Sequence, residues 1–234
     1  YEKVFAKGVQ LRTETGLGVL HLFCKPTPTT DAQAVIAAVK AAEGAGDQVV
    51  PVAVLGHKAD LAFMVLGDEL RRQRRFQSEL QAAGLEVVDS YVSLTEVSEY
   101  AQGMPEEMKT PRLHPQLPPE GKSAWCFYPM SKKREPEQNW FTEPYERRKE
   151  LMLEHGTSGR KFAGRVLQVV TGSTGLDDYE WGVTLFAAHP ATQVARAPDD
   201  GAAQSDAFAQ VRVVVHDHPL EVGVGPHAHV GAEH

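Results

Sequence analysis

Hydrophobic and polar positions in the first hundred residues switch between a period of two and a helical period. Four apolar or alternating runs predict strands at Val19–Phe23, Val49–Leu55, Ala59–Leu66 and Val87–Leu94. Two segments with helical spacing lie between them, Ala32–Glu43 and Asp68–Ala83, and Asp31 is a suitable N-cap for the first. The order β-α-β-β-α-β predicts a ferredoxin-like unit.

The same pattern starts again after a proline-rich connector. The segment Gly103–Gly121 holds five prolines, so we expect an extended chain rather than a packed element. Beyond it we predict three strands and one helix, at Ala124–Tyr128, Phe162–Thr171, Trp181–Phe186 and Pro144–His155, with Gly156 just past the helix. Only Val211–Val215 then has the pattern of a strand, and Pro190–Gln210 makes a poor helix. The sequence therefore predicts an α+β fold of two ferredoxin-like (βαββαβ) units, the second incomplete at its C-terminus.

These patterns divide the chain into four parts. Residues 1–102 form the N-terminal ferredoxin-like unit, 103–123 the connector, 124–188 the C-terminal unit and 189–234 a divergent tail. The tail is acidic and His-rich, with six acids against two bases and five of the ten histidines after residue 215. Few aliphatic side chains offset its ordering entropy, so we expect it to pack poorly, and we interpret its two His-x-His pairs as adventitious rather than metal-binding.

Composition narrows the class of protein. The net charge of -7, from 24 basic and 31 acidic residues, gives no overall field that attracts nucleic acid or anionic lipid. The longest apolar runs fall far short of the ~20 residues that a membrane helix requires. Two cysteines, Cys24 and Cys126, make neither a disulfide framework nor a four-ligand zinc site. We expect a soluble cytoplasmic protein, with no nucleic acid or membrane as partner, whose numbering starts inside a longer natural chain.

Two residues at the ends of predicted elements can carry chemistry. His155 ends a predicted helix, where a histidine is either favoured by the helix dipole or presented as a metal or haem ligand. Tyr128 ends a strand that runs into Lys132-Lys133-Arg134. Its segment is either a strand end followed by solvated charges, or a redox-active or acid-base phenol beside cations that hold a carboxylate. The residues alone leave both pairs of alternatives open.

The connector holds a second pair of candidates, Arg112 and His114, between Pro111 and Pro115. Prolines stiffen the backbone, so these side chains either face solvent or are aimed to bind an anion and accept a proton. The chain has no P-loop lysine beside its Gly172–Gly175 run and no Gly-x-Ser-x-Gly elbow, which argues against nucleotide binding and serine hydrolysis.

A set of short stretches points to one family. They are Cys126-Phe-Tyr-Pro-Met-Ser-Lys-Lys133, Asn139-Trp-Phe141, Glu146-Arg147, His155-Gly156, Gly159-Arg-Lys-Phe-Ala-Gly164, Thr171-Gly-Ser173, Gly175-Leu-Asp-Asp-Tyr-Glu-Trp-Gly-Val-Thr-Leu-Phe186, His57-Lys-Ala-Asp60 and Tyr91-Val-Ser93. Together they resemble the coproheme decarboxylases of the chlorite dismutase superfamily, in their actinobacterial form. The resemblance covers Val19–Ala188, and after Ala188 the family's closing helix and strand have no convincing match here.

The resemblance implies an oxidoreductase of haem biosynthesis. Such an enzyme takes Fe-coproporphyrin III (coproheme) as substrate and redox cofactor and uses hydrogen peroxide to convert two propionates to vinyl groups, giving haem b. The implied subunit is a dimeric α+β barrel built from the two ferredoxin-like units. The implied partners are further copies of the chain in a homo-oligomer, a pentamer, and a transient contact with the coproporphyrin ferrochelatase.

Matched residue by residue, the resemblance assigns three catalytic or metal roles and one anion-binding role. His155 matches the proximal iron ligand, and Tyr128 matches the tyrosine that becomes a radical and attacks the propionate. Lys132 matches the lysine beside the reactive propionates. Arg112 matches an arginine that pairs with a propionate.

The remaining matches concern the pocket walls and the peroxide side. Met130 and Trp140 match residues of the substrate pocket, although Trp140 on its own is interpreted as a core aromatic. His114 is similar to the distal histidine that serves as the peroxide base. Gln168 stands where chlorite-dismuting relatives carry an arginine, which argues against chlorite as substrate. Two rival functions stay open: a chlorite-converting or peroxidase-like haem enzyme, and a non-catalytic haem-binding carrier or sensor.

Overall fold

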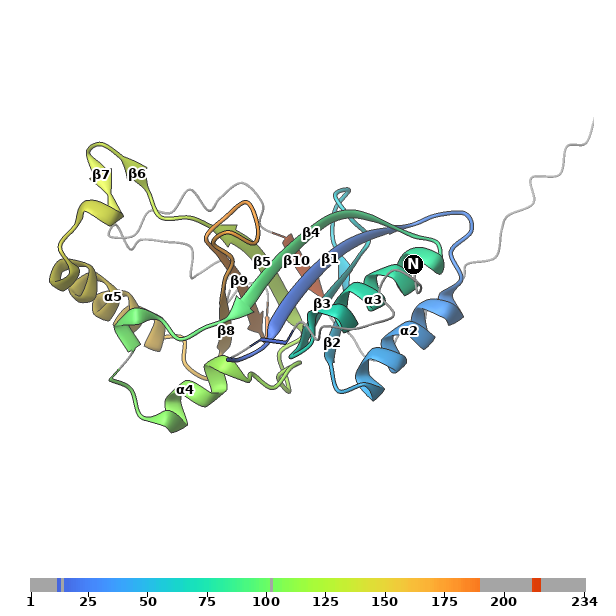
Figure 1. Ribbon diagram of the computed structural model, residues 1–234, viewed down its shortest axis with the longest axis horizontal. Helices are drawn as coiled ribbons and strands as arrows, with labels where there is room; N and C mark the ends of the chain where they lie inside the picture. Colours follow the sequence, from blue (N-terminus) through green and yellow to red (C-terminus); the bar gives the residue numbers. More distant parts are fainter. Residues whose placement is uncertain (1–11, 14, 102, 190–211, 216–234) are drawn as a thin grey trace, which may run out of the picture.

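The computed structural model describes residues 12, 13, 15–101, 103–189 and 212–215 (Figure 1). The N-terminal half has the predicted element order: β1 (Gly18–Pro26), α2 (Ala32–Gly44), β2 (Gln48–Val54), β3 (Leu61–Gly67), α3 (Leu70–Ala82) and β4 (Leu85–Thr95). The Asp31 carboxylate accepts hydrogen bonds from the backbone N–H groups of Gln33 and Ala34, at 2.9 and 3.1 Å, which confirms the predicted N-cap. Gly84 follows α3 with φ of 88°, a conformation that favours glycine.

The described main elements of the C-terminal half follow the order β-α-β-β and end with one further strand, with shorter elements added. Its elements are η1 (Glu99–Ala101), α4 (Glu106–Leu113), β5 (Ala124–Met130), β6 (Arg134–Glu135), β7 (Gln138–Asn139), η2 (Trp140–Thr142), α5 (Tyr145–Arg160), β8 (Val166–Gly172), β9 (Trp181–Ala187) and β10 (Arg212–Val215). The strands β6 and β7 form a short hairpin of their own. The three strands predicted at β5, β8 and β9 are confirmed, although β8 begins four residues later than expected.

The connector is not extended throughout, and that prediction was wrong for residues 106–113. They form α4, although Pro111 lies inside it. Two acidic residues stand in its first turn, where the helix dipole favours negative charge. The Leu113 carbonyl accepts a hydrogen bond from Thr95 Oγ1 at 2.8 Å, so the end of α4 is tied to the end of β4. The proline content of the connector gives no information about this long-range contact.

The prediction that the second-half helix ends at His155 was also wrong. α5 continues through Gly156 to Arg160, and the next glycine with positive φ is Gly164, at 78°. His155 therefore lies before the last turn of α5. Because the helix-dipole effect falls off within the last turn, it does not account for a histidine at this position.

The eight main strands close into one barrel in the order β1-β3-β2-β10-β5-β9-β8-β4 (Figure 1). β10 is antiparallel to both β2 and β5, and it joins the two halves along that seam. The barrel confirms the expected subunit architecture, and β10 supplies the strand predicted at Val211–Val215. The expected poor packing of the tail concerns residues 190–211 and 216–234, which lie outside the described residues.

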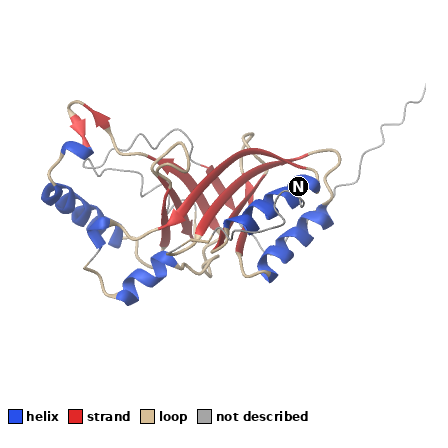
Figure 2. Cartoon of the chain, in the orientation of Figure 1, coloured by secondary structure: helices blue, strands red, loops and turns tan. Residues whose placement is uncertain are grey.

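Two apolar clusters explain where the stability of the fold comes from. Seven strands contribute buried side chains to one cluster, which fills the barrel interior and includes Phe23, Trp125 and Phe127. A second cluster joins α2 and α3 to the outer face of the N-terminal strands, with Phe76 and Leu80 at most 1% exposed. Burying each such side chain contributes roughly 1.5–3 kcal/mol. The helices of the N-terminal half are thus sealed onto their sheet (Figure 2).

No helix among the described residues is long and apolar enough to span a membrane.

Candidate functional site

The outer face of β5, β9 and β8 brings together several of the candidate residues. Side chains alternate along β5, so Trp125 and Phe127 point into the barrel while Cys126, Tyr128 and Met130 point outward. Strand register places Tyr128 opposite Val183, and Cys126 opposite Leu185, which pairs in turn with Gln168. These pairings form a third apolar cluster, centred on Cys126, Val183 and Leu185 with Tyr128, Met130 and Val166 packed against it. We call this surface the outer C-terminal face.

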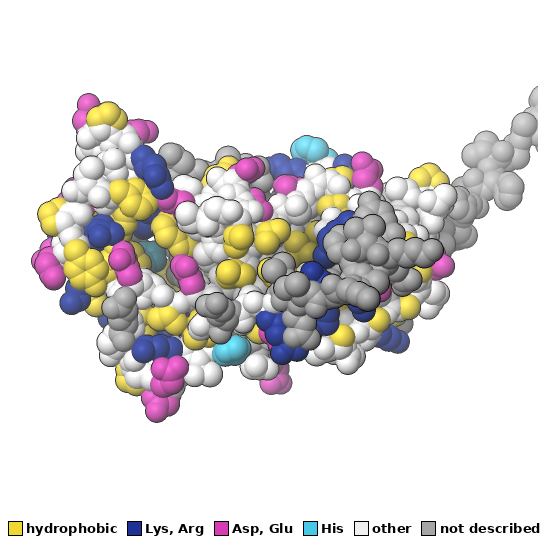
Figure 3. Space-filling model, in the orientation of Figure 1, with side chains coloured by type: hydrophobic (Ala, Val, Ile, Leu, Met, Phe, Trp, Pro, Cys, Tyr) yellow, Lys and Arg dark blue, Asp and Glu magenta, His cyan; other side chains and the backbone are white. Residues whose placement is uncertain are grey.

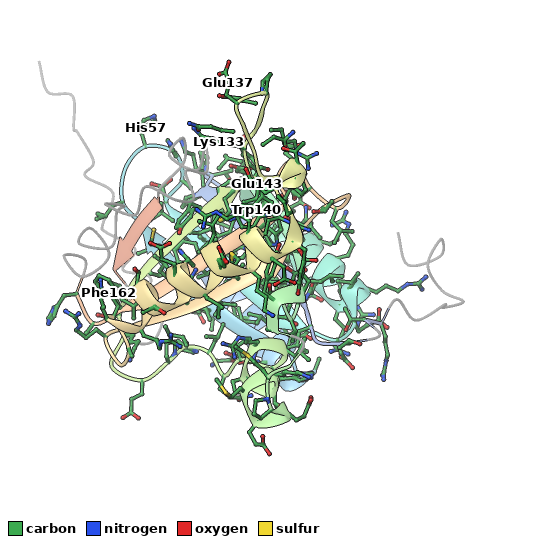
Figure 4. All side chains as sticks on the ribbon, turned by 90° about the vertical axis from the view of Figure 1, so that its left-hand side faces the viewer. His57, Lys133, Glu137, Trp140, Glu143 and Phe162 are labelled. Atoms are coloured by element: carbon green, nitrogen blue, oxygen red, sulfur yellow. The ribbon has the colours of Figure 1, made fainter. Side chains whose placement is uncertain are left out.

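α5 contributes no side chain to the apolar cluster of the outer C-terminal face, whereas α2 and α3 both contribute to the cluster of the N-terminal face. α5 runs across the strands on the side away from α2 and α3, as the two views show (Figures 1 and 4). None of the residues of α5, all of which the structure describes, is buried, and the third apolar cluster takes no residue from it. Val170 on β8 is 37% exposed, and Met152 on the side of α5 that faces the protein is only partly buried. α5 therefore does not pack on this face through buried side chains, and we call the region between α5 and the outer C-terminal face the slot.

His155 belongs to the stripe of α5 that faces the rest of the protein. Arg148, Met152 and Gly159 are only partly exposed, and His155 follows the same spacing of three to four residues. The imidazole is nonetheless exposed. An exposed side chain on the inward stripe indicates that His155 is presented to the slot.

Lys132 and Trp140 form one end of the site, just beyond β5. The ammonium group of Lys132 lies 4.2 Å from the centre of the Trp140 ring, and the backbone N–H of Trp140 donates to the carbonyl of Lys133 at 3.0 Å. Burial lowers the pKa of Lys132, while the negative charge of Glu180 opposes that shift. Trp140 is therefore not a core aromatic, since it is half-exposed and serves as a platform for a cation.

A cluster that the sequence did not single out anchors the N-terminal end of α5. Arg148 donates to Glu99 Oε1 and to the Tyr100 hydroxyl, both at 3.0 Å, and the rings of Tyr100 and Tyr145 stack at 5.6 Å. Tyr100 also meets Trp140 edge-on at 6.4 Å. Figure 4 labels Trp140 at this end of α5 and Phe162 beyond the other. The only sequence signal was an aromatic residue in an otherwise polar stretch after β4.

Arg112 and His114 stand on a separate element, α4 and its C-cap. The Arg112 guanidinium is exposed and donates to the Met108 carbonyl of its own helix. His114 lines another cavity of about 510 Å³, together with Gln48, Leu66 and Arg72 of the N-terminal half. The structure thus assembles Tyr128, Met130, Gln168, Lys132 and Trp140 around one slot facing the helix of His155, with Arg112 and His114 carried by α4.

The site combines apolar and charged groups in a way that fits a flat, apolar ligand with anionic edges. The apolar strand side chains suit a hydrophobic ring face, an imidazole suits iron, and Lys132 suits a carboxylate. Figure 3 shows hydrophobic side chains interspersed with basic and acidic ones on this side of the molecule. Buried Cys126, whose pKa burial raises to about 11, contributes as a neutral apolar group.

Comparison with known proteins gives the following matches. Residues 29–195 match the family described as chlorite dismutase. A protein of Natronomonas pharaonis, named as a candidate heme-binding protein, is 46% identical over 156 residues, which are 58% of this chain and 25% of that protein. A coproheme decarboxylase of Staphylococcus saprophyticus is 42% identical over 150 residues, 58% of each chain. These matches span about a quarter and somewhat over half of the two relatives.

Solved structures agree with the fold. A heme-binding protein from Thermus thermophilus superposes with a TM-score of 0.74 at 30% identity, over 89% of this chain and 95% of that one. A chlorite dismutase variant from Candidatus Nitrospira defluvii gives a TM-score of 0.63 at 19% identity, over 86% and 92%. The second similarity is one of fold alone.

Proposed function

Because the chain belongs to the chlorite dismutase family, we propose that its slot binds an iron porphyrin and that it oxidatively decarboxylates two propionates of Fe-coproporphyrin III with hydrogen peroxide. The observation that carries this proposal is the apolar outer C-terminal face, whose edge residues Tyr128 and Met130 are only partly buried, on the side of the barrel where α5 carries His155. A porphyrin is flat and apolar on both faces and carries its carboxylates at the edge. It would cover the partly exposed apolar side chains at the edge of this face, Tyr128, Met130 and Val166, a favourable change of about 25 cal/mol for each Å².

The chain's residues divide the work of holding this substrate. His155 would bind the iron, and Met130 and Trp140 would contact the macrocycle. Lys132 and Arg112 would hold propionates by charge-assisted hydrogen bonds. When bound, the iron porphyrin supplies the redox chemistry with peroxide. Fixing the carboxylates lets the protein direct that chemistry to chosen propionates.

Tyr128 is the residue proposed to act on the substrate itself. Its phenol gives up one electron and one proton, and it then takes a hydrogen atom from the propionate held beside it. For each propionate, one peroxide and one proton are consumed, and one carbon dioxide, one vinyl group and two waters are formed. Tyr128 is half-buried, so the surrounding protein can orient its phenol toward a bound substrate.

The proton on peroxide needs a base near neutral pH, and a second group can orient the peroxide. His114 carries this role by family resemblance, as an imidazole can. Gln168 lies on the outer C-terminal face itself and can orient peroxide by hydrogen bonding but cannot take its proton.

Mass spectrometry of the protein mixed with coproheme and titrated with peroxide tests the proposal. We expect the loss of two carboxyl groups and the appearance of haem b. Tyr128→Phe should bind coproheme within about threefold of the parent yet form no vinyl group, because only one oxygen is removed. Tyr179→Phe, which alters a partly buried tyrosine packed on the barrel cluster, is the matched control and should turn over normally. Haem b formation by Tyr128→Phe at the parent rate would remove Tyr128 from the proposal.

The same assay separates the rival functions. Oxygen release from chlorite would support a chlorite-converting enzyme. Coproheme binding with no change of mass in the parent protein would support a carrier or sensor, a function to which the names of two relatives also point. We further propose a homo-pentamer, for which light scattering should give five times the mass of one chain.

A further inference from the structure

We propose that Glu180 is a positioning residue: its carboxylate holds the backbone that carries Lys132 and supplies the negative charge that faces it. This inference rests on the proposed function, in which Lys132 holds a propionate. Glu180 itself is placed by a loop between β8 and β9 and touches no residue assigned to the iron.

Four hydrogen bonds join Glu180 to the chain at the end of β5 and just beyond it. Its Oε2 accepts the backbone N–H of Lys132 at 2.8 Å, and its Oε1 accepts from the guanidinium of Arg134. Its own backbone N–H donates to the Met130 carbonyl and to Ser131 Oγ, both at 3.2 Å. Glu180 is only 8% exposed, so these bonds compete little with water.

Glu180 lies next to the point where the pairing between β5 and β9 ends, so it can hold the segment that follows β5. The ladder between β5 and β9 ends with Met130 opposite Trp181, and Glu180 immediately precedes Trp181. Residues 131–133 have no regular secondary structure, so no ladder bond fixes them. Where the chain leaves the sheet, the carboxylate of Glu180 accepts the backbone N–H of Lys132 and so fixes a segment that no strand pairing holds.

The same carboxylate organises the charges around Lys132. Arg134, which Glu180 binds, lies 4.2 Å from the centre of the Phe141 ring, just as Lys132 lies 4.2 Å from that of Trp140. Both cations therefore lie over aromatic rings of η2, whose first two residues are Trp140 and Phe141. Among the described residues, Glu180 across the loop is the charged group that acts on Lys132, and Arg134 binds the same carboxylate. Burial lowers the pKa of Lys132 and Glu180 raises it, so Glu180 favours the ammonium form that binds carboxylates.

The titration of Lys132 in the ligand-free protein tests this role. Lysines are labelled by reductive methylation with ¹³C, and Lys132→Arg identifies the Lys132 signal. In Glu180→Gln, which keeps size and a hydrogen-bond acceptor, Lys132 should titrate at a lower pH than in the parent. In the matched variant Arg134→Gln, which removes a positive neighbour but keeps Glu180, it should titrate at the same or a higher pH. An unchanged titration in Glu180→Gln, or the same downward shift in both variants, would overturn the proposal.

Turnover supplies the second readout. With coproheme and peroxide near pH 7, Glu180→Gln should form vinyl groups at least about tenfold more slowly while binding coproheme within about threefold of the parent. A loss confined to binding would overturn the positioning role. If the parent protein binds coproheme without product, the proposed function fails, and the Lys132 titration still decides the role of Glu180. Matching thermal unfolding curves ensure that the variants compared are folded.

Discussion

His21 is buried inside the barrel, and this should make the free energy of unfolding depend on pH. The residue is 1% exposed, its Nε2 lies 3.0 Å from Thr184 Oγ1, and its ring stacks on Phe127 at 4.2 Å. Burial lowers the pKa of His21 to about 3. The folded state therefore keeps the imidazole neutral over a pH range in which the unfolded chain protonates it.

The sign and size of the effect follow from the two pKa values. Between the ordinary pKa of 6.5 and the folded value of about 3, the unfolded state binds one more proton than the folded state, so stability is lost as pH falls. Each pH unit well inside this range costs about 1.4 kcal/mol. From pH 7.5, His21 should remove about 1.4 kcal/mol by pH 5.5 and about 2.7 kcal/mol by pH 4.5.

Urea unfolding at a series of pH values measures this loss. His21→Gln removes the titrating group but keeps a polar side chain facing Thr184, so its stability should fall less steeply with acid than that of the parent. His57→Gln, which alters an exposed histidine, is the control and should follow the parent. Carboxylates elsewhere affect all three proteins alike, so the difference between the curves isolates His21. Parallel curves for the parent and His21→Gln would refute the reasoning.

Three further predictions concern the slot and the thiols. His155→Ala should weaken coproheme binding and change the ferric absorption spectrum, and an unchanged spectrum would assign the iron ligand elsewhere. His114→Ala should slow the peroxide reaction most at pH values where peroxide is protonated, whereas Gln168→Ala should slow it without that pH dependence. A peroxide reaction of His114→Ala that matches the parent's at every pH in stopped-flow traces would exclude His114 as the base. Cys24 and Cys126 should react with a thiol reagent at pH 8 only after denaturation, because burial raises their pKa values to about 12 and 11, and prompt labelling of the folded protein would contradict this.

The sequence by itself determined most of the regular elements and part of the chemistry. Period-two and helical patterns act over a few residues, so they predicted the six elements of the N-terminal half and the strands β5, β8 and β9. The N-cap predicted at Asp31 is equally local and was confirmed. Tyr128 and Lys132 could be selected because an aromatic strand followed by cations is itself a local signal.

Only the tertiary structure decided what those elements enclose. The strands form a closed barrel because β10 pairs with both β2 and β5, and register between distant strands sets which side chains share the outer C-terminal face. α4 forms despite Pro111, and its end is tied to β4, while α5 passes through Gly156. The role proposed for Glu180 depends on hydrogen bonds to Lys132 and Arg134, which lie 48 and 46 residues away in the sequence. Local patterns report which face of an element avoids water, whereas the partner that covers that face, or leaves it open, is set by contacts between residues far apart in the chain.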